Sequence, residues 1–188
     1  MPPAIMGKTA VFLDRDDTLI ENVPYLGDPE KVTLLPGVSS AIAELHRSKL
    51  PLIVISNQSG VGRGLITKEE VRSVDARMEE LLGGDKLFTH YGHCYAAPGD
   101  PYDDRRKPSP KMLQEAAVAF DIDLKKSFMV GNRWSDIQAG NAAGCKTILL
   151  NLRVPPEELE RSVQIASFTA RDWSSAKDWI LEQSEKMK

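Results

Sequence analysis

The sequence predicts an α/β protein with a doubly wound, Rossmann-like parallel β-sheet flanked by helices. Two observations predict this class. Short apolar segments rich in β-branched residues alternate along the chain with longer segments whose apolar residues recur at helical spacing. The short segments are also nearly continuous in hydrophobicity, as strands covered on both faces must be. Because each parallel crossover needs a helix, the alternation favours a parallel sheet.

Four segments have the character of buried strands: residues 9–14 (TAVFLD), 50–56 (LPLIVIS), 127–131 (SFMVG) and 146–151 (KTILLN). Sheets of this class bind ligands beyond the carboxyl ends of their strands. We therefore expect the chemically informative residues to lie directly after these segments.

Two of the helices between the strands have clear start signals. Thr67 and Glu70 form a capping box ahead of a stripe of apolar residues. Ser109 and Pro110 have the order of a cap and a first helical residue. Further helical patterns cover residues 38–47, residues 135–143 and a closing segment that contains Trp173 and Trp179, whose side chains we expect in the core.

Composition limits the class of protein. The 188 residues correspond to one domain at roughly 100–200 residues per domain. Apolar residues make up 41% and charged residues 27%, which excludes a mainly disordered, collagen-like or coiled-coil chain. The formal net charge of -3 provides no bulk positive field for nucleic acid or an anionic membrane, so we expect neither as a partner. The oligomeric state stays open.

The sequence also suggests a compartment. Its two cysteines, Cys94 and Cys145, are too few for a disulfide framework and fit a reducing environment. Residues 1–8 lack the pattern of a secretory leader, and no segment approaches the ~18 apolar residues of a membrane span. We therefore expect a cytoplasmic protein.

Two acidic residues follow the first predicted strand. Asp14 ends the strand and Asp16 lies two residues later, where an extended chain turns. Two carboxylates at this spacing can converge on one hard cation such as Mg²⁺, which prefers oxygen ligands. One of them stays free to attack phosphorus.

The residues after the second strand suit an anion. Ser56, Asn57 and the glycines that follow provide a hydroxyl, an amide and accessible backbone N–H groups, and Arg63 adds a planar cationic fork. Taken alone, this stretch is equally typical of a flexible glycine loop, because it is neither a dinucleotide-binding nor a Walker A motif.

Two further groups of polar residues complete the pattern. Arg106 and Lys107 precede the helix that starts near Ser109, so we expect at least one cation to project into the same crevice. Asn132 and Asp136 follow the third predicted strand, where a metal ligand and its supporting group would lie.

These motifs, in this order, resemble those of the haloacid dehalogenase-like (HAD) phosphohydrolases. The matching pieces are Leu13-Asp14-Arg15-Asp16, Ser56-Asn57-Gln58-Ser59-Gly60, Arg106-Lys107-Pro108, and Gly131 with Asp136-Ile137-Gln138-Ala139-Gly140. The resemblance is closest to the branch that contains heptose bisphosphate phosphatases and histidinol-phosphate phosphatases. It implies one phosphatase domain over residues 1–188. The connections after the first strand and after the second helix are too short for a large cap domain.

The resemblance implies a role for each residue. Asp14 would be the nucleophile that forms an aspartyl-phosphate, and Asp16 the acid and base for the leaving oxygen and the water. Phosphoryl oxygens would be held by Ser56 and Asn57, with Lys107 neutralising their charge. The resemblance also implies that Mg²⁺ lies among Asp14, Asp16, Asn132 and Asp136, and that Arg63 and Arg106 contact the rest of the substrate.

Two positions depart from the family pattern. Asp17 replaces the usual glycine after the second aspartate, and Asn132 replaces the usual aspartate after Gly131. An amide oxygen coordinates a hard cation more weakly than a carboxylate does. We hypothesise that the metal site is weakened and that the added carboxylate of Asp17 partly offsets the loss.

Many members of this branch carry a zinc-binding loop before the Arg-Lys-Pro segment. Here His90, His93 and Cys94 supply only three candidate ligands, and strand alternation places the two histidines on opposite faces. We therefore expect no zinc site, and we interpret Cys145 as a buried small apolar residue.

The sequence thus predicts a Mg²⁺-dependent phosphomonoesterase for a small phosphorylated metabolite, with D-glycero-D-manno-heptose 1,7-bisphosphate as the leading substrate. Histidinol phosphate is the alternative within the class. A non-catalytic phosphometabolite binder is the alternative from another class, motivated by Asp17 and Asn132. A response-regulator-like receiver is disfavoured, because its phosphorylated aspartate would end a later strand, and the second strand here ends in Ser56 and Asn57.

Overall fold

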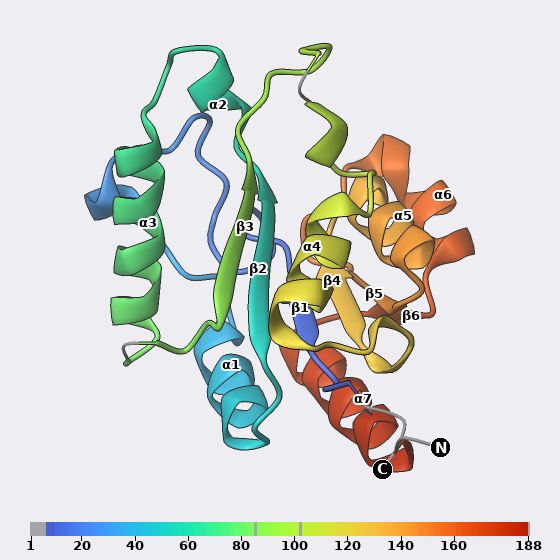
Figure 1. Ribbon diagram of the computed structural model, residues 1–188. Coiled ribbons are helices and arrows are strands. Elements are labelled where there is room, and N and C mark those ends of the chain that lie inside the picture. Colours follow the sequence, from blue (N-terminus) through green and yellow to red (C-terminus); the bar gives the residue numbers. More distant parts are fainter. Residues whose placement is uncertain (1–6, 85, 102, 188) are drawn as a thin grey trace.

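Within the described residues, six parallel strands form one sheet in the order β3-β2-β1-β4-β5-β6 (Figure 1). The computed structural model describes residues 7–84, 86–101 and 103–187. The strands are β1 (Val11–Leu13), β2 (Leu52–Asn57), β3 (His90–Cys94), β4 (Phe128–Gly131), β5 (Lys146–Leu150) and β6 (Phe168–Ala170). The strand order reverses between β1 and β4, which is the switch point at which doubly wound sheets bind ligands. The predicted fold class is confirmed.

The helices are α1 (Val38–Arg47), α2 (Ser59–Gly62), α3 (Lys68–Leu81), α4 (Lys111–Phe120), α5 (Trp134–Ala143), α6 (Pro156–Ile165) and α7 (Trp173–Lys186), with short 3₁₀ turns η1 (Pro29–Lys31), η2 (Asp103–Arg105) and η3 (Leu124–Lys126). Alternating strand residues divide the core in two. Val11 and Leu13 belong to a buried cluster with α1, α3 and α7, whereas Phe12 packs with α4 on the other face. Helices therefore cover both faces of the sheet.

The structure confirms the four predicted strands, which start or end within one or two residues of the predicted bounds; β2 extends one residue further, to Asn57. It also confirms the capping box of α3, in which Glu70 N donates to Thr67 Oγ1 at 3.1 Å. The start of α4 was predicted one residue early. The Pro110 carbonyl accepts the first helical hydrogen bond, from Gln114 N at 3.0 Å, which makes Pro110 the cap and Lys111 the first helical residue.

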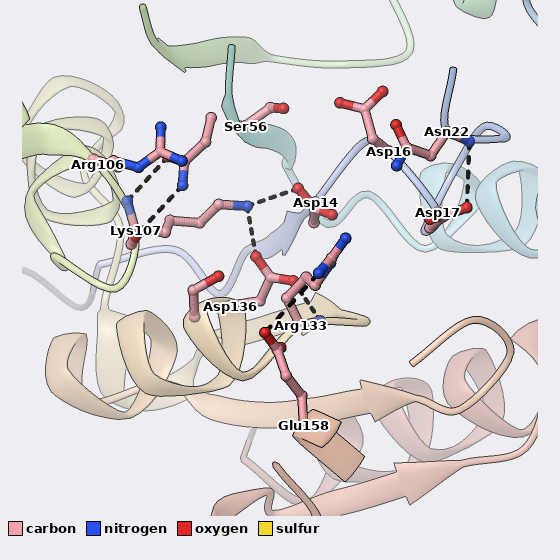
Figure 2. Close-up of a pocket in the computed structure, with 12 residues that line it drawn as sticks. Asp14, Asp16, Asp17, Asn22, Ser56, Arg106, Lys107, Arg133, Asp136 and Glu158 are labelled. Carbon is pink, nitrogen blue, oxygen red and sulfur yellow. Dashed lines mark hydrogen bonds and ion pairs between the residues drawn. The ribbon is translucent and has the colours of Figure 1, made fainter. Parts of the chain in front are cut away.

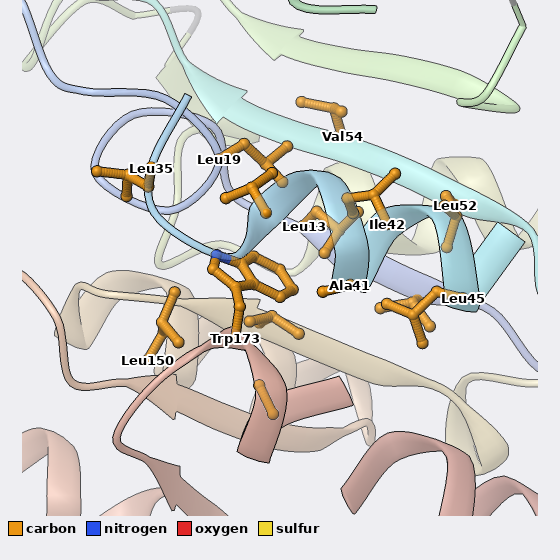
Figure 3. Packing of buried hydrophobic residues seen from close by; sticks show 14 of the residues in the cluster. Leu13, Leu19, Leu35, Ala41, Ile42, Leu45, Leu52, Val54, Leu150 and Trp173 are labelled. Carbon is orange, nitrogen blue, oxygen red and sulfur yellow. The ribbon is translucent and has the colours of Figure 1, made fainter. Parts of the chain in front are cut away.

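The tryptophan prediction is confirmed for Trp173, whereas Trp179 is half-buried and packs against the same apolar cluster. Trp173 is fully buried among apolar residues that include Leu13 and Leu35 (Figure 3). Its indole Nε1–H donates to the Thr18 carbonyl at 2.8 Å, which satisfies the buried polar group. Because Thr18 follows the acidic motif after β1, Trp173 anchors that motif from α7.

Some sequence-based expectations concern other parts of the molecule. Cys94 and Cys145 are both buried free thiols, and burial raises the pKa of Cys145 to about 12. The expectation that residues 1–8 are not a secretory leader concerns a segment that lies mostly outside the described residues. Of the helices that the structure describes, none has the length and apolarity needed to cross a bilayer.

Candidate active site

Polar side chains gather in a hollow of about 340 Å³ at the carboxyl edge of the sheet (Figure 2). Asp14 directly follows β1, and its N–H donates to the Val130 carbonyl of β4 at 2.9 Å, so the hollow lies at the switch point. The lining residues are Asp14, Asp16, Asp17, Asn22, Ser56, Asn57, Arg106, Lys107, Arg133, Ser135, Asp136 and Glu158. The structure therefore brings together most of the residues that the sequence selected.

Lys107 is the centre of the charge arrangement. Its Nζ lies 2.7 Å from Asp14 Oδ1 and 2.6 Å from Asp136 Oδ1, and it also donates to the Ile55 carbonyl at 2.7 Å (Figure 2). Lys107 is only 4% exposed. One buried ammonium thus binds two carboxylates, Asp14 and Asp136, that lie 122 residues apart in the sequence.

The two carboxylates share this single cation. Burial and the neighbouring Asp136 raise the pKa of Asp14 to about 7, against the attraction of Lys107. Burial alone lowers the pKa of Lys107, but Asp136 and Asp14 raise it above its ordinary value. Lys107 therefore stays protonated, and the site has a deficit of positive charge that a cation can supply.

This arrangement predicts a pH dependence of stability without metal. The pKa of Asp14 is 3.8 in an unperturbed state and about 7 in the fold, so the folded state binds its proton more tightly. The contribution of Asp14 to the unfolding free energy therefore falls as pH rises from about 4 to about 7. Urea unfolding in EDTA across this range, comparing wild type with Asp14→Asn, measures it. A difference between the two proteins that stays constant with pH would contradict the prediction.

Local geometry explains why Gly131 precedes the α5 turn. Asp136 Oδ2 accepts a hydrogen bond from Arg133 N at 2.9 Å, so the carboxylate folds back over the start of its own helix. A Cβ at Gly131 would overlap the Asp136 side chain. Glycine is thus required there for Asp136 to reach Lys107, and both Asp136 oxygens are engaged within the protein.

Asp16 and Ser56 are connected by a residue that the sequence interpretation did not select. Gln58 Nε2 lies 2.8 Å from Asp16 Oδ2 and 2.8 Å from Ser56 Oγ. Because Ser56 Oγ accepts from Gln58, its own proton is free to point at an anion in the hollow. The signal for Gln58 was its place in the motif after the second strand.

Asn57 holds the backbone of Lys107 in addition to the phosphate-binding role predicted for it. Its Oδ1 accepts from Lys107 N at 3.0 Å, and its Nδ2 donates to the Lys107 carbonyl at 3.2 Å. The amide thereby fixes the backbone that carries the lysine. Its role in holding phosphoryl oxygens stays a prediction.

The oxygens around Thr18 fit a hard cation. Thr18 Oγ1 lies 3.3 Å from Asp14 Oδ2 and 3.4 Å from Asn132 Oδ1, so these two oxygens converge. The described residues contain no cluster of three His, Cys, Asp or Glu side chains suited to a metal. A small site of one carboxylate, one amide oxygen, backbone and water is compatible with Mg²⁺, which commonly keeps several waters.

The two departures from the family pattern meet at one residue. Asn132 Nδ2 donates to the Arg153 carbonyl at 2.9 Å, and Arg153 Nη1 lies 3.8 Å from Asp17 Oδ1. Asp17 has a left-handed backbone, with φ of 57°, which suits the glycine usual at this position. The Asp17 carboxylate is thus paired with Arg153. This pairing leaves less of the Asp17 negative charge to compensate for the carboxylate that is missing at position 132.

The arginines divide into two groups. Arg106 lines the hollow, and its Nη1 is buried with no hydrogen-bond partner among the described residues. Arg63 is exposed at the end of α2 and is absent from the lining of the hollow. Arg133, which the sequence interpretation did not select, lines the hollow instead, with Glu158 of α6 at 3.9 Å.

Arg133 and Glu158, two of the residues that were not selected, both had a signal in the sequence. Arg133 lies within the motif after β4, between two residues that were selected. Glu158 belongs to a helix that was not predicted, although Pro156 at its first position and the acidic residues after it are helix-start signals. Glu158 Oε2 accepts from Trp134 N at 2.8 Å and so caps α5.

The histidines of β3 point to opposite faces, as strand alternation predicts. The His90 ring lies 5.3 Å from that of Phe120 of α4, whereas His93 Nε2 lies 2.7 Å from Asp75 Oδ2 of α3. The two rings therefore cannot share one metal ion without rearrangement of the strand.

Comparisons with known proteins agree with this site. Residues 104–167 match the family model of HAD-hydrolase-like proteins. A D-glycero-D-manno-heptose-1,7-bisphosphate 7-phosphatase from Thermosynechococcus vestitus is 35% identical, with 93% of this chain and 96% of the relative covered. One of the same name from Chlorobaculum tepidum is 33% identical, with 82% and 84% covered.

A solved structure has the same fold. The D,D-heptose 1,7-bisphosphate phosphatase from B. bronchiseptica, complexed with magnesium and phosphate, superimposes with a TM-score of 0.83. The two chains are 26% identical, and the match covers 93% of this chain and 99% of the other. With its fold, its motifs and these relatives, the chain belongs to the HAD-like phosphatases, in the group of the heptose bisphosphate phosphatases.

Proposed function

We propose that this protein is a Mg²⁺-dependent cytoplasmic phosphatase that hydrolyses D-glycero-D-manno-heptose 1,7-bisphosphate through an aspartyl-phosphate. The observation that carries the proposal is the buried Asp14 carboxylate, held by Lys107 at the switch point of the sheet and facing a hollow that Ser56 and Asp16 also line. The names of the relatives support the choice of substrate.

The reaction divides into two displacements. Asp14 attacks phosphorus, the bond from phosphorus to the sugar oxygen breaks, and Asp16 gives a proton to the departing oxygen. Asp16 then takes a proton from a water molecule, which attacks phosphorus and breaks the bond to Asp14. Inorganic phosphate leaves, Asp14 is again a carboxylate and Asp16 again carries its proton. Ser56 Oγ and Lys107 Nζ are positioned to stabilise the charge on the phosphoryl oxygens.

Asp14, the amide oxygen of Asn132 and the Asp16 backbone carbonyl would hold Mg²⁺, with Asp136 fixing the adjacent lysine. Bound Mg²⁺ supplies positive charge that offsets repulsion between the carboxylates and an incoming phosphate. The raised pKa of Asp14 supports this assignment, because it reflects the charge deficit that a cation relieves.

Arg106 and Arg133 support a substrate with two phosphates. The buried Nη1 of Arg106 lacks a partner, and Arg133 has one carboxylate neighbour at 3.9 Å. Two cationic forks at the mouth of the hollow favour a second anionic group over the amine of histidinol phosphate. An adjoining hollow shares Asp16 and Arg133 and extends to Tyr25, which gives room for a sugar.

The test is phosphate release from a substrate panel with Mg²⁺ and with EDTA. We expect heptose 1,7-bisphosphate to be hydrolysed with the highest kcat/KM, and activity to be lost in EDTA. Faster hydrolysis of histidinol phosphate would replace the proposed substrate. A wild type that is as inert as Asp14→Asn toward every compound would identify a non-catalytic binder.

Asn132→Asp tests the hypothesis of a weakened metal site. The added carboxylate should tighten Mg²⁺ binding, measured by titration calorimetry. Without metal it should lower the unfolding free energy by about 1–3 kcal/mol, because the Arg153 carbonyl loses its donor and faces a buried negative charge.

Asn141→Asp is the matched control for this change. Asn141 Nδ2 donates to the Ile165 carbonyl at 2.9 Å, the same type of contact, but Asn141 is exposed and does not line the hollow. Its Mg²⁺ affinity should equal that of wild type. An Asn132→Asp protein with unaltered Mg²⁺ affinity would contradict the hypothesis.

A further inference from the structure

A line of buried charged groups leads from Asp16 away from the hollow. Arg15 Nη2 lies 3.2 Å from both Asp16 oxygens, and Arg15 Nη1 lies 3.0 Å from Asp75 Oδ1 of α3. The second Asp75 oxygen lies 2.7 Å from His93 Nε2 of β3. Arg15, Asp75 and His93 are 1%, 5% and 6% exposed, whereas the Asp16 side chain is 25% exposed and faces the hollow.

Stability alone does not account for this arrangement. Moving a charged group into a protein interior costs several kcal/mol per ion, and well-packed apolar side chains of similar volume commonly give equal or greater stability. Arg15 and Asp75 are 60 residues apart in sequence, and both are buried charged groups. The placement of Arg15 and Asp75 instead fixes the position of Asp16, at the exposed end of the line.

We propose that Asp75 is a positioning residue for the reaction, acting through Arg15 on the acid and base Asp16. The inference rests on the proposed function and extends it to residues outside the hollow. Asp75 holds one edge of the Arg15 guanidinium and leaves the Nε and Nη2 edge for Asp16, with Arg15 Nε at 3.3 Å from Asp16 Oδ1. A planar group held at two edges has a fixed plane.

The fixed plane determines where the Asp16 oxygens lie. Gln58 Nε2 approaches Asp16 Oδ2 at 2.8 Å from the other side, so the carboxylate is held by Arg15 and Gln58 together. Asp75 also balances the charge of Arg15, which lets the guanidinium orient Asp16 without acting as an unpaired buried cation. His93 holds the remaining oxygen of Asp75 and so fixes the rotamer of the whole group.

A positioning role and a merely structural role of Asp75 predict different effects on hydrolysis rates. Protonation by Asp16 matters for a sugar alkoxide, which is a poor leaving group, and matters little for p-nitrophenolate or for the acetate released from acetyl phosphate. Misplacing Asp16 should therefore slow sugar phosphate hydrolysis more than hydrolysis of the activated compounds. General loss of folded protein slows all of them equally.

The experiment compares kcat/KM for heptose bisphosphate, p-nitrophenyl phosphate and acetyl phosphate, because kcat/KM reports the first displacement, whereas the second displacement is common to all three. Asp75→Asn should lower kcat/KM for the sugar phosphate by about 10–100-fold more than for the activated compounds, in the direction of Asp16→Asn. KM for the sugar phosphate should change little. Glu69→Gln removes an exposed carboxylate from the same helix α3 and should leave the ratio unchanged.

Two further measurements keep the test decisive. His93→Gln retains Arg15 and Asp75 and should shift the same ratio by a smaller factor, which covers the case that Asp75→Asn does not fold. In the Asp16→Asn background, Asp75→Asn should cause no further loss of kcat/KM, because both changes act on one group.

The two possible failures are distinguishable. A wild-type protein that releases no phosphate from any compound contradicts the proposed function itself. Equal losses of kcat/KM for sugar and activated phosphates in Asp75→Asn, or an additive loss in the double variant, with wild type active, overturn the positioning role of Asp75 alone.

Discussion

Asp14→Asn is expected to lower phosphate release by at least about 10⁴-fold, because the proposed nucleophile is lost and the covalent route closes. Stability should move the other way. Asp14 and Asp136 share Lys107 in the fold, so removing one carboxylate leaves one buried cation with one buried anion. Near neutral pH without metal, we expect the variant to unfold at the same temperature as wild type or higher.

Phosphate release and thermal unfolding measure the two effects on the same preparation. Rapid acid quench with radiolabelled substrate should trap phosphoprotein from wild type and none from Asp14→Asn. Asp178→Asn changes a carboxylate on α7 that is 65% exposed, and it should match wild type in both assays. More than about a hundredth of wild-type activity in Asp14→Asn would contradict the covalent mechanism.

Lys107→Met is expected to damage both activity and stability. Its removal leaves the buried carboxylates of Asp14 and Asp136 facing each other without their shared cation. Breaking a buried ion pair from one side commonly costs about 3–5 kcal/mol of unfolding free energy. Loss of one preorganised positive group at the phosphoryl oxygens should lower kcat by about 10²–10³-fold. Urea unfolding in EDTA and steady-state kinetics measure the two effects.

A control variant and a double variant test whether carboxylate repulsion causes the expected loss of stability in Lys107→Met. Lys111→Met removes a lysine that is 45% exposed, paired with Asp104, and should change stability by no more than about 0.5 kcal/mol. Adding Asp14→Asn to Lys107→Met should recover part of the lost stability, because one of the two unpaired carboxylates is gone. A double variant less stable than Lys107→Met would show that carboxylate repulsion is not the cause.

The sequence was most informative where local pattern and chemistry coincide. Apolar continuity located the four inner strands, and the rule that ligands lie beyond their carboxyl ends directed attention to Asp14, Ser56 and Asn132. It was least informative for β6 and α6. β6 is three residues long with two of them half-buried, and α6 starts in a Pro-Pro segment for which no helix was predicted.

Some site residues could likewise be identified from the sequence, and others could not. Position in a motif identified Asp14, Asp16, Lys107 and Asp136, which all line the hollow. The placement of Arg63 was different, because its position in the glycine segment did not reveal that it ends α2 as an exposed residue outside the lining of the hollow. Arg133 and Glu158 enter the site from elements around α5.

The alternation of the four inner strands with helices, the edge of the sheet that carries the chemistry and the residue types available there were determined by the sequence itself. Only the tertiary structure decided which charges share a partner: Lys107 between two carboxylates, Arg153 beside both departures, and Arg15 between Asp16 and Asp75. The reason is physical. Hydrophobic periodicity is local along the chain, whereas the electrostatics of a buried charge depend on neighbours within a few ångströms that folding brings from distant segments.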